Sequence, residues 1–448
     1  MLEYNTVMTN VQIIYVNINE VKQPVNVDLR AVIPVYRRVL NEKSVREPVV
    51  VEKTTMVVLR GCEILEALKL LSADKVPVLQ VDSSKVKVRS LQPGLKPITL
   101  ETVIKAGIEG PRLPYRSFDA QIEEVPNIEV SLNELSIWKK VKERRLRVYD
   151  NTLELLYKDW PTPLVKLQSF SSEERSVWAK LEGANPYSNS VKDRIGWSMI
   201  MSALEEGRLG DILYEATSTN TGIAITAIAN LLGRKARLFI PKTIQKASDV
   251  FLKVLGADVV RVPVGLTIEA IGEVDARSRA EGATHLNQFE NDANFKVHLK
   301  YTAKEIDEQL ESRGLKPDCI IGGLGTSGHM SAVSIYFKSK YGDTVKIIGV
   351  QPAPNEVIPG IRRIETGMKW VHWVDFDQII DVKKNEAIEG ALTVARREGL
   401  LIGLSAGAVF YAFAKVAEDK GVYVLIFPDT GYKYAEQFEE YFHSVQQC

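Results

Sequence analysis

The chain has 448 residues, 45% of them apolar and 25% charged, and its formal net charge at pH 7 is zero. This length predicts two or three domains with their own cores, and the balanced charge argues against a nucleic-acid or membrane-surface binder. The three cysteines, Cys62, Cys319 and Cys448, show no CxxC spacing, and no signal peptide or membrane-length apolar run is evident, so we expect a cytoplasmic protein without disulfides or a zinc site.

The first 119 residues predict a small α+β domain. Short strands are expected at residues 11–16, 48–51, 56–59 and 76–81, and helices at 30–40, 62–71 and 100–106. Ile64, Leu65 and Leu68 fall at helical spacing and support the second helix. The segment 120–133 is acidic and aperiodic, so we interpret residues 120–146 as a linker with a lead-in helix.

Residues 147–448 predict a second, larger α/β domain. Apolar strands alternate there with amphipathic helices; strands are expected at 177–181, 211–216, 236–240, 258–262, 319–321, 345–350 and 422–427, and helices at 195–206, 222–232, 247–255 and 386–398. Strands regularly separated by helices indicate a parallel sheet. In such folds ligands gather at the carboxyl ends of the strands.

Lys192 is the most informative single residue. It lies in the run Asn-Pro-Tyr-Ser-Asn-Ser-Val-Lys-Asp-Arg at 185–194. A lysine among small hydrogen-bonding residues is a candidate Schiff-base lysine for an aldehyde cofactor, pyridoxal phosphate. The alternative is an ordinary solvated loop lysine, and the motifs farther along the chain favour the catalytic interpretation.

A polar loop at 215–222, Glu-Ala-Thr-Ser-Thr-Asn-Thr-Gly, follows a predicted strand and opens a helix. Thr217, Ser218, Asn220 and Thr221 place hydroxyls, an amide and free backbone N–H groups at the helix N-terminus, which suits an α-carboxylate. Helix capping alone needs one such residue, whereas four fall within five positions here.

A glycine-rich loop at 322–329, Gly-Gly-Leu-Gly-Thr-Ser-Gly-His, follows another predicted strand. Gly323, Gly325 and Gly328 let backbone amides close around a phosphate, and Thr326 and Ser327 add hydroxyl donors. The spacing matches neither the nucleotide P-loop nor a dinucleotide fingerprint.

Two further turns lie near the C-terminus. The small-residue turn at 403–407, Gly-Leu-Ser-Ala-Gly, is compatible with close packing of a helix on the sheet. Pro-Asp-Thr-Gly at 428–431 ends the last core strand and leaves the Thr430 hydroxyl free to meet a ring nitrogen, which favours elimination over transamination. Asp429 is a rival partner for that nitrogen.

Together with Pro-Thr-Pro-Leu at 161–164 and Asn-Gln-Phe at 287–289, these motifs resemble the β-family (fold type II) pyridoxal-phosphate enzymes, specifically the cysteine synthases, over about residues 147–448. The resemblance implies a tryptophan synthase β-like fold of two parallel-sheet subdomains and a homodimer. It implies that pyridoxal 5′-phosphate is the cofactor and that an amino acid and sulfide are the substrates. In the implied β-replacement, the freed lysine removes the α-proton, the β-substituent leaves to give an aminoacrylate, and sulfide adds.

The resemblance also assigns the site residues by type of contact. The cofactor ligands are Lys192 as Schiff-base lysine, Asn220 at the 3′-oxygen, Thr430 at the ring nitrogen, and a phosphate loop of Gly325, Thr326, Ser327, Gly328 and His329. The substrate ligands are Thr217, Ser218, Thr219, Thr221, Gln288 and Phe289.

Two departures from the common pattern resemble the branch that uses O-phosphoserine instead of O-acetylserine. Thr219 replaces a glycine and His329 replaces a threonine, and Ile-Arg-Arg-Ile-Glu-Thr-Gly follows at 361–367. A dianionic leaving phosphate needs a fixed cation, for which we favour Arg362, with Arg363 as the alternative and a solvated surface turn as the third interpretation. O-acetylserine sulfhydrylase, cystathionine β-synthase, threonine synthase and a regulatory protein without turnover remain alternatives.

The first domain resembles the ParB/sulfiredoxin-like fold, and the stretches 98–104 and 113–119 resemble archaeal free-serine kinases of that fold. Its functional residues are missing: Gly-Cys-Glu at 61–63 replaces the cationic turn, residues 22–28 lack the catalytic glutamate, and Ser-Phe-Asp at 117–119 replaces Thr-Arg-His. We predict a degenerate domain with a structural or regulatory role, and an active serine kinase is the alternative. DNA binding fits poorly because no basic recognition helix appears. Cys62 is predicted to be buried rather than redox-active, and the histidines show no metal spacing.

Overall fold

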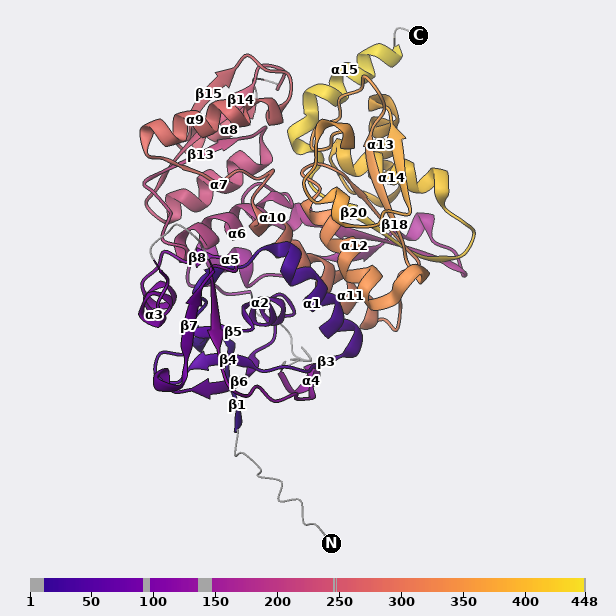
Figure 1. Cartoon of the computed structure of the whole chain (residues 1–448). Helices are drawn as coiled ribbons and strands as arrows, with labels where there is room; N and C mark the ends of the chain where they lie inside the picture. Colours follow the sequence, from indigo (N-terminus) through magenta and orange to yellow (C-terminus); the bar gives the residue numbers. More distant parts are fainter. Residues whose placement is uncertain (1–11, 92–96, 136–146, 245, 247, 447–448) are drawn as a thin grey trace. The chain divides into compact units, whose positions relative to one another are not determined.

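The computed structural model describes residues 12–91, 97–135, 147–244, 246 and 248–446. The chain divides into two compact units, Met1–Arg144 and Arg145–Cys448, whose elements are labelled in Figure 1. Within the described ranges, no helix is long and apolar enough to cross a membrane. The same ranges contain no group of three histidine, cysteine or acidic side chains that could hold a metal ion.

The first unit is built on a four-stranded mixed sheet in the order β1-β6-β4-β5. Strand β6 pairs antiparallel with β1 and parallel with β4, and β4 pairs antiparallel with β5. The strands are β1 (Ile13–Asn17), β4 (Val49–Glu52), β5 (Val58–Arg60) and β6 (Lys75–Val81), and the helices are α1 (Leu29–Glu42), α2 (Cys62–Leu70) and α3 (Leu100–Ile108). Each predicted element of residues 1–119 is therefore present, with ends shifted by a few residues.

Three short strand pairs complete this unit and correct the predicted linker. Strand β2 (Val25–Asn26) pairs with β8 (Leu113–Pro114), β7 (Lys87–Ser90) with β9 (Phe118–Gln121), and β3 (Ser44–Val45) with β10 (Val130–Ser131). The segment 120–133 is thus not a linker, because its ends belong to β9, β10 and the short helix α4 (Leu132–Leu135). A two-residue strand is too short to show a periodic pattern, so its pairing with a distant strand could not be predicted from the sequence. The lead-in helix lies in part outside the described residues.

The second unit contains two sheets, as the predicted fold class of two parallel-sheet subdomains requires. The larger has the order β11-β12-β20-β17-β18-β19, and all its pairings are parallel except the one between β11 and β12. The smaller has the order β15-β14-β13-β16 and is fully parallel. The larger sheet consists of β11 (Leu164–Lys166), β12 (Arg175–Leu181), β17 (Cys319–Gly323), β18 (Lys346–Pro352), β19 (Gln378–Val382) and β20 (Gly421–Phe427), and the smaller of β13 (Ile212–Ala216), β14 (Lys235–Pro241), β15 (Asp258–Val262) and β16 (Thr284–His285).

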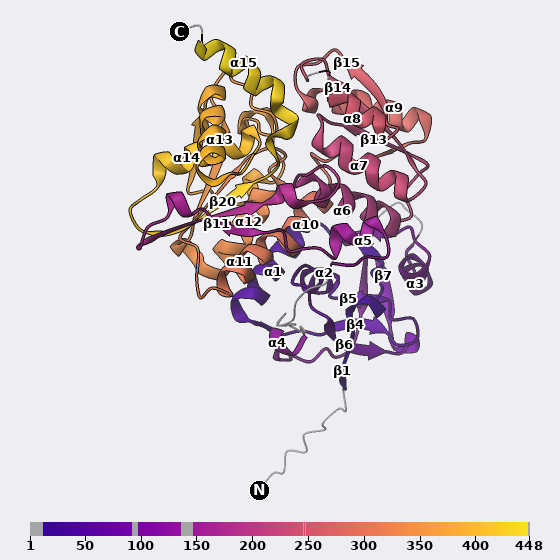
Figure 2. The same ribbon diagram turned by 180° about the vertical axis from the view of Figure 1, so that it is seen from behind.

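Helices follow the strands of both sheets, and in both views α12, α13 and α14 lie around the larger sheet (Figures 1 and 2). A helix that starts directly after a parallel strand turns its N-terminus toward the carboxyl edge of the sheet, where ligands bind. The helices are α5 (Thr152–Tyr157), α6 (Lys192–Glu205), α7 (Asn220–Leu231), α8 (Ser248–Val254), α9 (Ile271–Glu281), α10 (Asp292–Val297), α11 (Ala303–Glu311), α12 (Gly328–Tyr341), α13 (Lys384–Glu398), α14 (Leu404–Val416) and α15 (Ala435–Gln446).

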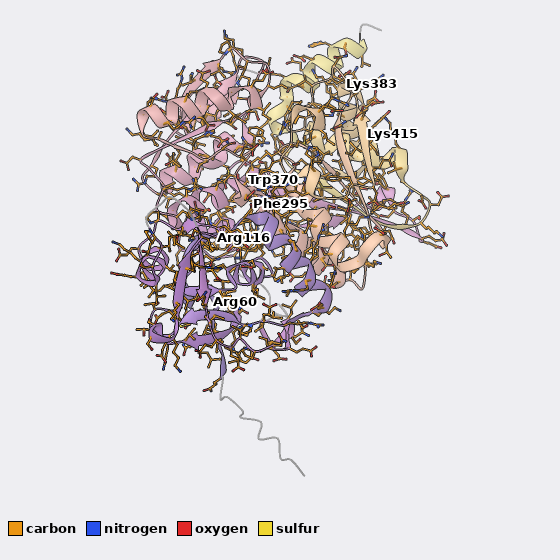
Figure 3. The ribbon with its side chains drawn as sticks, in the orientation of Figure 1. Arg60, Arg116, Phe295, Trp370, Lys383 and Lys415 are labelled. Carbon is orange, nitrogen blue, oxygen red and sulfur yellow. The ribbon has the colours of Figure 1, made fainter. Side chains whose placement is uncertain are left out.

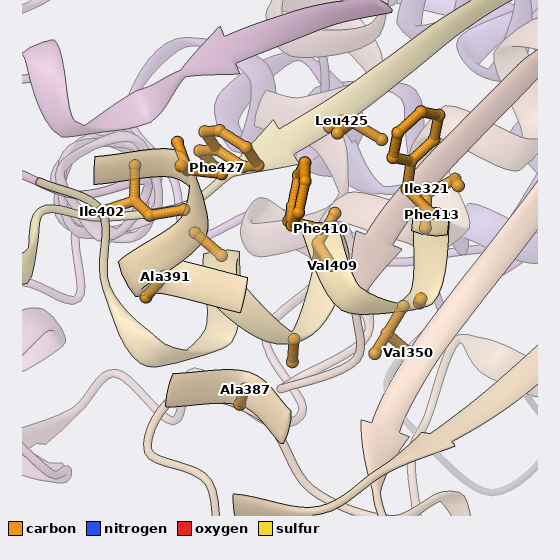
Figure 4. Close-up of a cluster of buried hydrophobic side chains, with 14 of the residues drawn as sticks. Ile321, Val350, Ala387, Ala391, Ile402, Val409, Phe410, Phe413, Leu425 and Phe427 are labelled. Carbon is orange, nitrogen blue, oxygen red and sulfur yellow. The ribbon is translucent and has the colours of Figure 1, made fainter. Parts of the chain in front are cut away.

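The core of the larger sheet is packed by apolar residues of α14, such as Phe410 and Phe413, beside Leu425 and Phe427 of β20 (Figure 4). Helices α13 and α14 approach closely at position 407, where only glycine fits. A Cβ at this position would lie 2.0 Å from the carbonyl oxygen of residue 387. Close packing therefore explains one glycine of the 403–407 turn.

A second apolar contact lies between α10 and the loop that follows β18. Phe295 and Trp370 are both fully buried, and their ring centroids are 6.4 Å apart (Figure 3). The Trp370 indole N–H donates to the Asp292 carboxylate at 3.0 Å, so this buried ring satisfies its polar group.

Candidate active site

A cavity of about 380 Å³ brings together residues from motifs far apart in the sequence. Its wall also includes Thr243, Ile244 and Ser248 and the segments 265–268 and 357–361. The predicted site residues on the wall are Lys192, Ser218, Thr219, Asn220, Thr221, Gln288, Phe289, Gly325, Thr326 and Arg362.

Lys192 is placed by the loop before it and by its own helix, α6. The Asp193 carboxylate accepts hydrogen bonds from the backbone N–H groups of Tyr187 (2.7 Å) and Ser188 (2.9 Å), which folds the loop back on the helix start. The Ser190 hydroxyl accepts from the N–H of Lys192 at 3.1 Å. Burial raises the pKa of Asp193 to about 6, although the Ser188 donors oppose this. The small polar residues of the motif therefore fix the backbone that carries the lysine.

Arg194 anchors the same helix in a buried charge network. Its guanidinium binds Glu182 (Nε to Oε2, 2.6 Å) and Glu305 (Nη2 to Oε2, 2.7 Å), and Lys180 also donates to Glu305 at 2.8 Å. Arginine in this position uses its planar fork to pair with two carboxylates at once. The network ties the start of α6 to β12 and α11, so the position of Lys192 depends on both.

The electrostatic surroundings of Lys192 favour a reactive amine. The pKa of Lys192 is lowered to about 8: burial lowers it most, the negative charge of Asp429 opposes this, and the positive charge of Arg362 adds to the lowering. A lysine with this pKa is in part unprotonated near neutral pH, as a nucleophile or general base requires.

The polar loop before α7 lines the same cavity. Gln288 accepts a hydrogen bond from the Thr221 hydroxyl (2.8 Å) and donates to the backbone carbonyl of Ala216 (3.0 Å), so its amide is held in place. Thr217 does not reach the wall: it is fully buried, and its hydroxyl accepts from the N–H of Gly222 at 3.1 Å. The structure therefore places Thr217 as a brace beneath the loop, and the other predicted substrate ligands of this loop on the cavity.

The glycine-rich loop leads into α12 in a conformation that its small residues permit. A Cβ at Gly325 would lie 2.5 Å from the carbonyl oxygen of Gly360, and one at Gly328 would lie 2.4 Å from Asn294 Oδ1, so neither position accepts a side chain. Ser327 has a φ of 73°, in the left-handed region. The tight turn aims the N-terminus of α12 at the cavity, and such an end binds anions.

Buried polar atoms at this helix end lack hydrogen-bond partners among the residues that the structure describes. The Ser327 Oγ and His329 Nε2 atoms are buried without a hydrogen bond, and with Gly328 they lie behind the wall formed by Gly325 and Thr326. Burial and the charge of Lys192 lower the pKa of His329 to about 3, so its ring is neutral. Unpartnered donors at a helix N-terminus fit the phosphate of the cofactor, with Lys192 and Asn220 on the same cavity.

The turn after β20 carries both candidates for the ring nitrogen. Thr430 is half-buried and does not lie on the cavity wall; its Cγ2 fills the space that a Cβ at Gly183 would occupy, 2.7 Å away. Asp429 is buried and accepts a hydrogen bond from the Asn220 amide at 2.9 Å. The partner of the ring nitrogen therefore stays a prediction.

The two adjacent arginines have different surroundings. Arg362 lies on the wall, donates from Nε to the Gly325 carbonyl (2.8 Å) and from Nη1 to the Thr366 hydroxyl (2.7 Å), and stacks over Phe289 at 5.1 Å. Arg363 is absent from the wall and pairs with Asp381 (3.0 Å) and Glu365 (2.9 Å). Arg362 is thus the arginine that faces the cavity.

Several wall residues were not predicted as site residues from the sequence, and four of them carry polar or charged side chains near the C-terminal part of the chain: Lys384, Lys433, Tyr434 and Gln437. Lys433 and Tyr434 lie two and three residues after the Pro-Asp-Thr-Gly turn, and this closeness was the only signal for them. Lys384 opens α13, where nothing in the local sequence distinguishes it from a solvated helix start.

Comparison with known proteins agrees with this geometry. The family model described as pyridoxal-phosphate dependent enzyme matches residues 155–429. A cysteine synthase of Staphylococcus aureus is 33% identical over 289 residues, which cover 61% of this chain and 92% of that protein. Cysteine synthase B of Escherichia coli is 35% identical over 284 residues, covering 61% and 91%.

Solved structures show the same likeness. The structure of an O-ureido-L-serine synthase is 27% identical with a TM-score of 0.56, covering 61% of this chain and 90% of its own. A hydrogen sulfide-producing enzyme from Fusobacterium nucleatum is 28% identical with a TM-score of 0.58, covering 64% and 100%. The chain therefore belongs to the family of pyridoxal-phosphate-dependent enzymes and is a cysteine-synthase-like member of it.

Proposed function

We propose that the second unit makes L-cysteine and inorganic phosphate from O-phosphoserine and sulfide. The observation that carries the proposal is Arg362, a cation on the same cavity as Lys192. Its Nε and Nη1 atoms bind the loop and Thr366, whereas, within the described residues, Nη2 has no acceptor and the guanidinium has no carboxylate partner within 4 Å. Two charged N–H groups are therefore left to bind an anion.

Lys192 moves the proton in this proposal. When bound, pyridoxal phosphate withdraws electrons from the α-carbon of the amino acid, which makes loss of the α-proton and of the β-substituent feasible. Lys192 Nζ takes the α-proton, since burial leaves its amine in part unprotonated near pH 8. Lys192 is half-buried in the cavity wall, which limits competing solvent.

The polar loop and Gln288 orient the substrate. The N-terminus of α7 and the hydroxyls of Ser218, Thr219 and Thr221 lie on the cavity, where they would bind the substrate carboxylate, which the helix dipole favours. The carboxylate end is then bound at α7 and the phosphate end at Arg362, so the bond to the leaving group lies between two fixed anion sites.

Arg362 neutralises the leaving phosphate. Phe289 lies beneath its guanidinium and Thr366 beside it, which fixes the plane of the donor fork. Desolvation lowers the pKa of Arg362 to about 10, which still leaves it charged at pH 7. An acetyl leaving group carries no comparable charge, so this cation favours O-phosphoserine over O-acetylserine.

The test is a substrate comparison with the purified full-length protein loaded with pyridoxal phosphate. We expect sulfide-dependent release of phosphate and formation of cysteine with O-phosphoserine, at a kcat/KM at least tenfold above that for O-acetylserine. A higher kcat/KM with O-acetylserine, or turnover only with homocysteine in place of sulfide, contradicts the proposal and favours the sulfhydrylase or cystathionine β-synthase alternatives.

For the first unit we propose a structural or regulatory role of a degenerate ParB-like domain, in a homodimeric protein. Cys62 supports it: the thiol is buried and its pKa is raised by burial and by Glu63, so it is neither a thiolate nor a phosphate ligand. Incubation with ATP and serine should yield no O-phosphoserine, and formation of it contradicts the proposal. Light scattering of the full chain should give twice the chain mass.

A further inference from the structure

Asp429 lies where the last strand of the larger sheet meets the lysine loop. Its backbone forms an isolated antiparallel bridge with Ser190, and the N–H of Val191 donates to the carbonyl of Pro428 at 2.8 Å. The residue is 3% exposed. The chain segment of Asp429 is therefore paired directly with the segment that ends in Lys192.

Only one of the two carboxylate oxygens of Asp429 accepts hydrogen bonds from the described residues. Its Oδ2 atom accepts from the Asn220 amide at 2.9 Å and from the Tyr434 hydroxyl at 2.5 Å. Its Oδ1 atom is buried and has no hydrogen-bond partner in the described part of the chain. Gly403 makes room for it, because a Cβ there would lie 1.9 Å from Oδ1. A buried charged oxygen without a partner is costly, which marks the position as functional.

The carboxylate determines how Asn220 is oriented. A carboxylate only accepts hydrogen bonds, so the amide must turn its Nδ2 atom toward Asp429. That bond uses Nδ2, and the Asn220 Oδ1 atom is left buried without a hydrogen-bond partner among the described residues, on the cavity that Asn220 lines. Without Asp429 the amide loses the charged acceptor that holds Nδ2 in this orientation.

Asp429 is also the negative charge that faces Lys192. Two cations, Arg362 and Lys433, share the cavity with this lysine. The neighbouring rings of His329 and His298 are neutral because burial lowers their pKa. Tyr434 stays protonated because burial and Asp429 raise its pKa. Asp429 opposes the effects of burial and of Arg362 and so raises the pKa of Lys192.

We propose that Asp429 is a positioning residue, which fixes the donor orientation of Asn220 and holds the negative charge that keeps Lys192 able to carry a proton. This inference rests on the proposed role of Lys192 and goes beyond it. In the proton transfer, Lys192 Nζ gains the α-proton and becomes an ammonium, and Asp429 stabilises that charge without itself exchanging a proton.

The test uses the full-length protein, freed of cofactor, and follows the rate of pyridoxal phosphate capture by absorbance as a function of pH. Asp429→Asn removes the charge and keeps a hydrogen-bond acceptor. Asp429→Ser also removes the charge, and its smaller side chain provides a second variant in case the asparagine variant does not fold. Asp307→Asn is the matched control, since Asp307 is buried and accepts from the Tyr336 hydroxyl at 2.8 Å, away from the cavity. The ionisable groups of free pyridoxal phosphate titrate identically in every experiment, so they do not contribute to the difference in midpoint between variants.

We expect the midpoint of the capture rate to fall by about one pH unit in both Asp429 variants, because loss of an opposite charge lowers the pKa of a lysine. The pH profile of kcat/KM should shift in the same direction, and the control should stay at the wild-type midpoint. Midpoints within 0.2 of a pH unit of wild type, in whichever Asp429 variant folds, overturn the inference. A wild-type protein that captures no cofactor overturns the proposed role of Lys192 instead.

Discussion

Replacement of Arg362 by methionine isolates the charge that distinguishes the two substrates. Methionine keeps a flexible chain of similar reach, so the space beside Phe289 stays filled. The variant loses the guanidinium bonds to the glycine-rich loop and to Thr366, and that loss affects both substrates equally. Only O-phosphoserine also loses the two N–H groups of Nη2.

The magnitude follows from those two donors. A hydrogen bond to a charged group contributes about 1.5–3 kcal/mol. Two such bonds to the phosphate therefore contribute at least about 3 kcal/mol, or roughly 150-fold in kcat/KM at about 1.4 kcal/mol per factor of ten. We expect the ratio of kcat/KM for O-phosphoserine to that for O-acetylserine to fall by about this factor.

The assay is steady-state cysteine formation with each substrate at saturating sulfide, which gives the ratio directly. Arg363→Met is the matched control: that arginine pairs with exposed carboxylates away from the cavity, so the ratio should change less than about threefold. An equal loss of both activities in Arg362→Met would refute the reasoning, since it would make the arginine a brace of the loop and not a phosphate ligand.

Three further predictions test the site and its support. The rate at which cofactor-free protein captures pyridoxal phosphate should rise with pH through about 8 and then level off, because the unprotonated amine of Lys192 is the nucleophile. In the control variant Lys192→Ala, borohydride reduction should fix no cofactor to the protein. A capture rate that does not change from pH 6 to pH 10 contradicts the lowered pKa of Lys192. Glu305→Gln should lower the free energy of unfolding by about 3–5 kcal/mol at pH 7, because it leaves buried cations uncompensated, whereas Glu308→Gln on the same helix should have little effect. The cations beside Glu305 hold its folded-state pKa well below the unfolded value, so this stabilisation is present above about pH 4 and is lost as pH falls; a difference in urea denaturation that persists at pH 2 contradicts this sign. Gly325→Ala should weaken cofactor affinity at least tenfold in an equilibrium titration, since the new Cβ would lie 2.5 Å from a backbone oxygen. The control Gly272→Ala, which has open space around it in α9, should bind the cofactor with normal affinity. Unchanged affinity in Gly325→Ala would mean that the loop can shift without weakening cofactor binding.

The sequence by itself determined the elements and the chemistry of the motifs. Hydrophobic periodicity located many strands and helices of both units to within a few residues, because burial of an amphipathic face is a local pattern, but it missed others such as β19, α9 and α11. Lys192, the polar loop before α7 and the glycine-rich loop were recognisable because each is contiguous. Their residue types indicate their chemistry before any fold is known.

Only the tertiary structure decided which side chains reach the cavity. Arg362 and Arg363 are adjacent and identical in type, yet one faces the cavity and the other an exposed pair of carboxylates. Thr217 matches its neighbours in type but lies beneath the loop. The side on which a loop residue emerges depends on backbone dihedrals and on distant packing partners, and neither leaves a periodic signal.

Long-range pairing was hidden for the same reason. The strand Val130–Ser131 was invisible because its partner is far along the chain. The Asp429–Asn220 contact joins residues 209 positions apart, and the buried network at Glu305 joins α11 to the start of α6. Such contacts form only when the sheet has brought distant segments of the chain together. The sequence therefore identifies the chemical groups, and only the fold determines which of them are in contact.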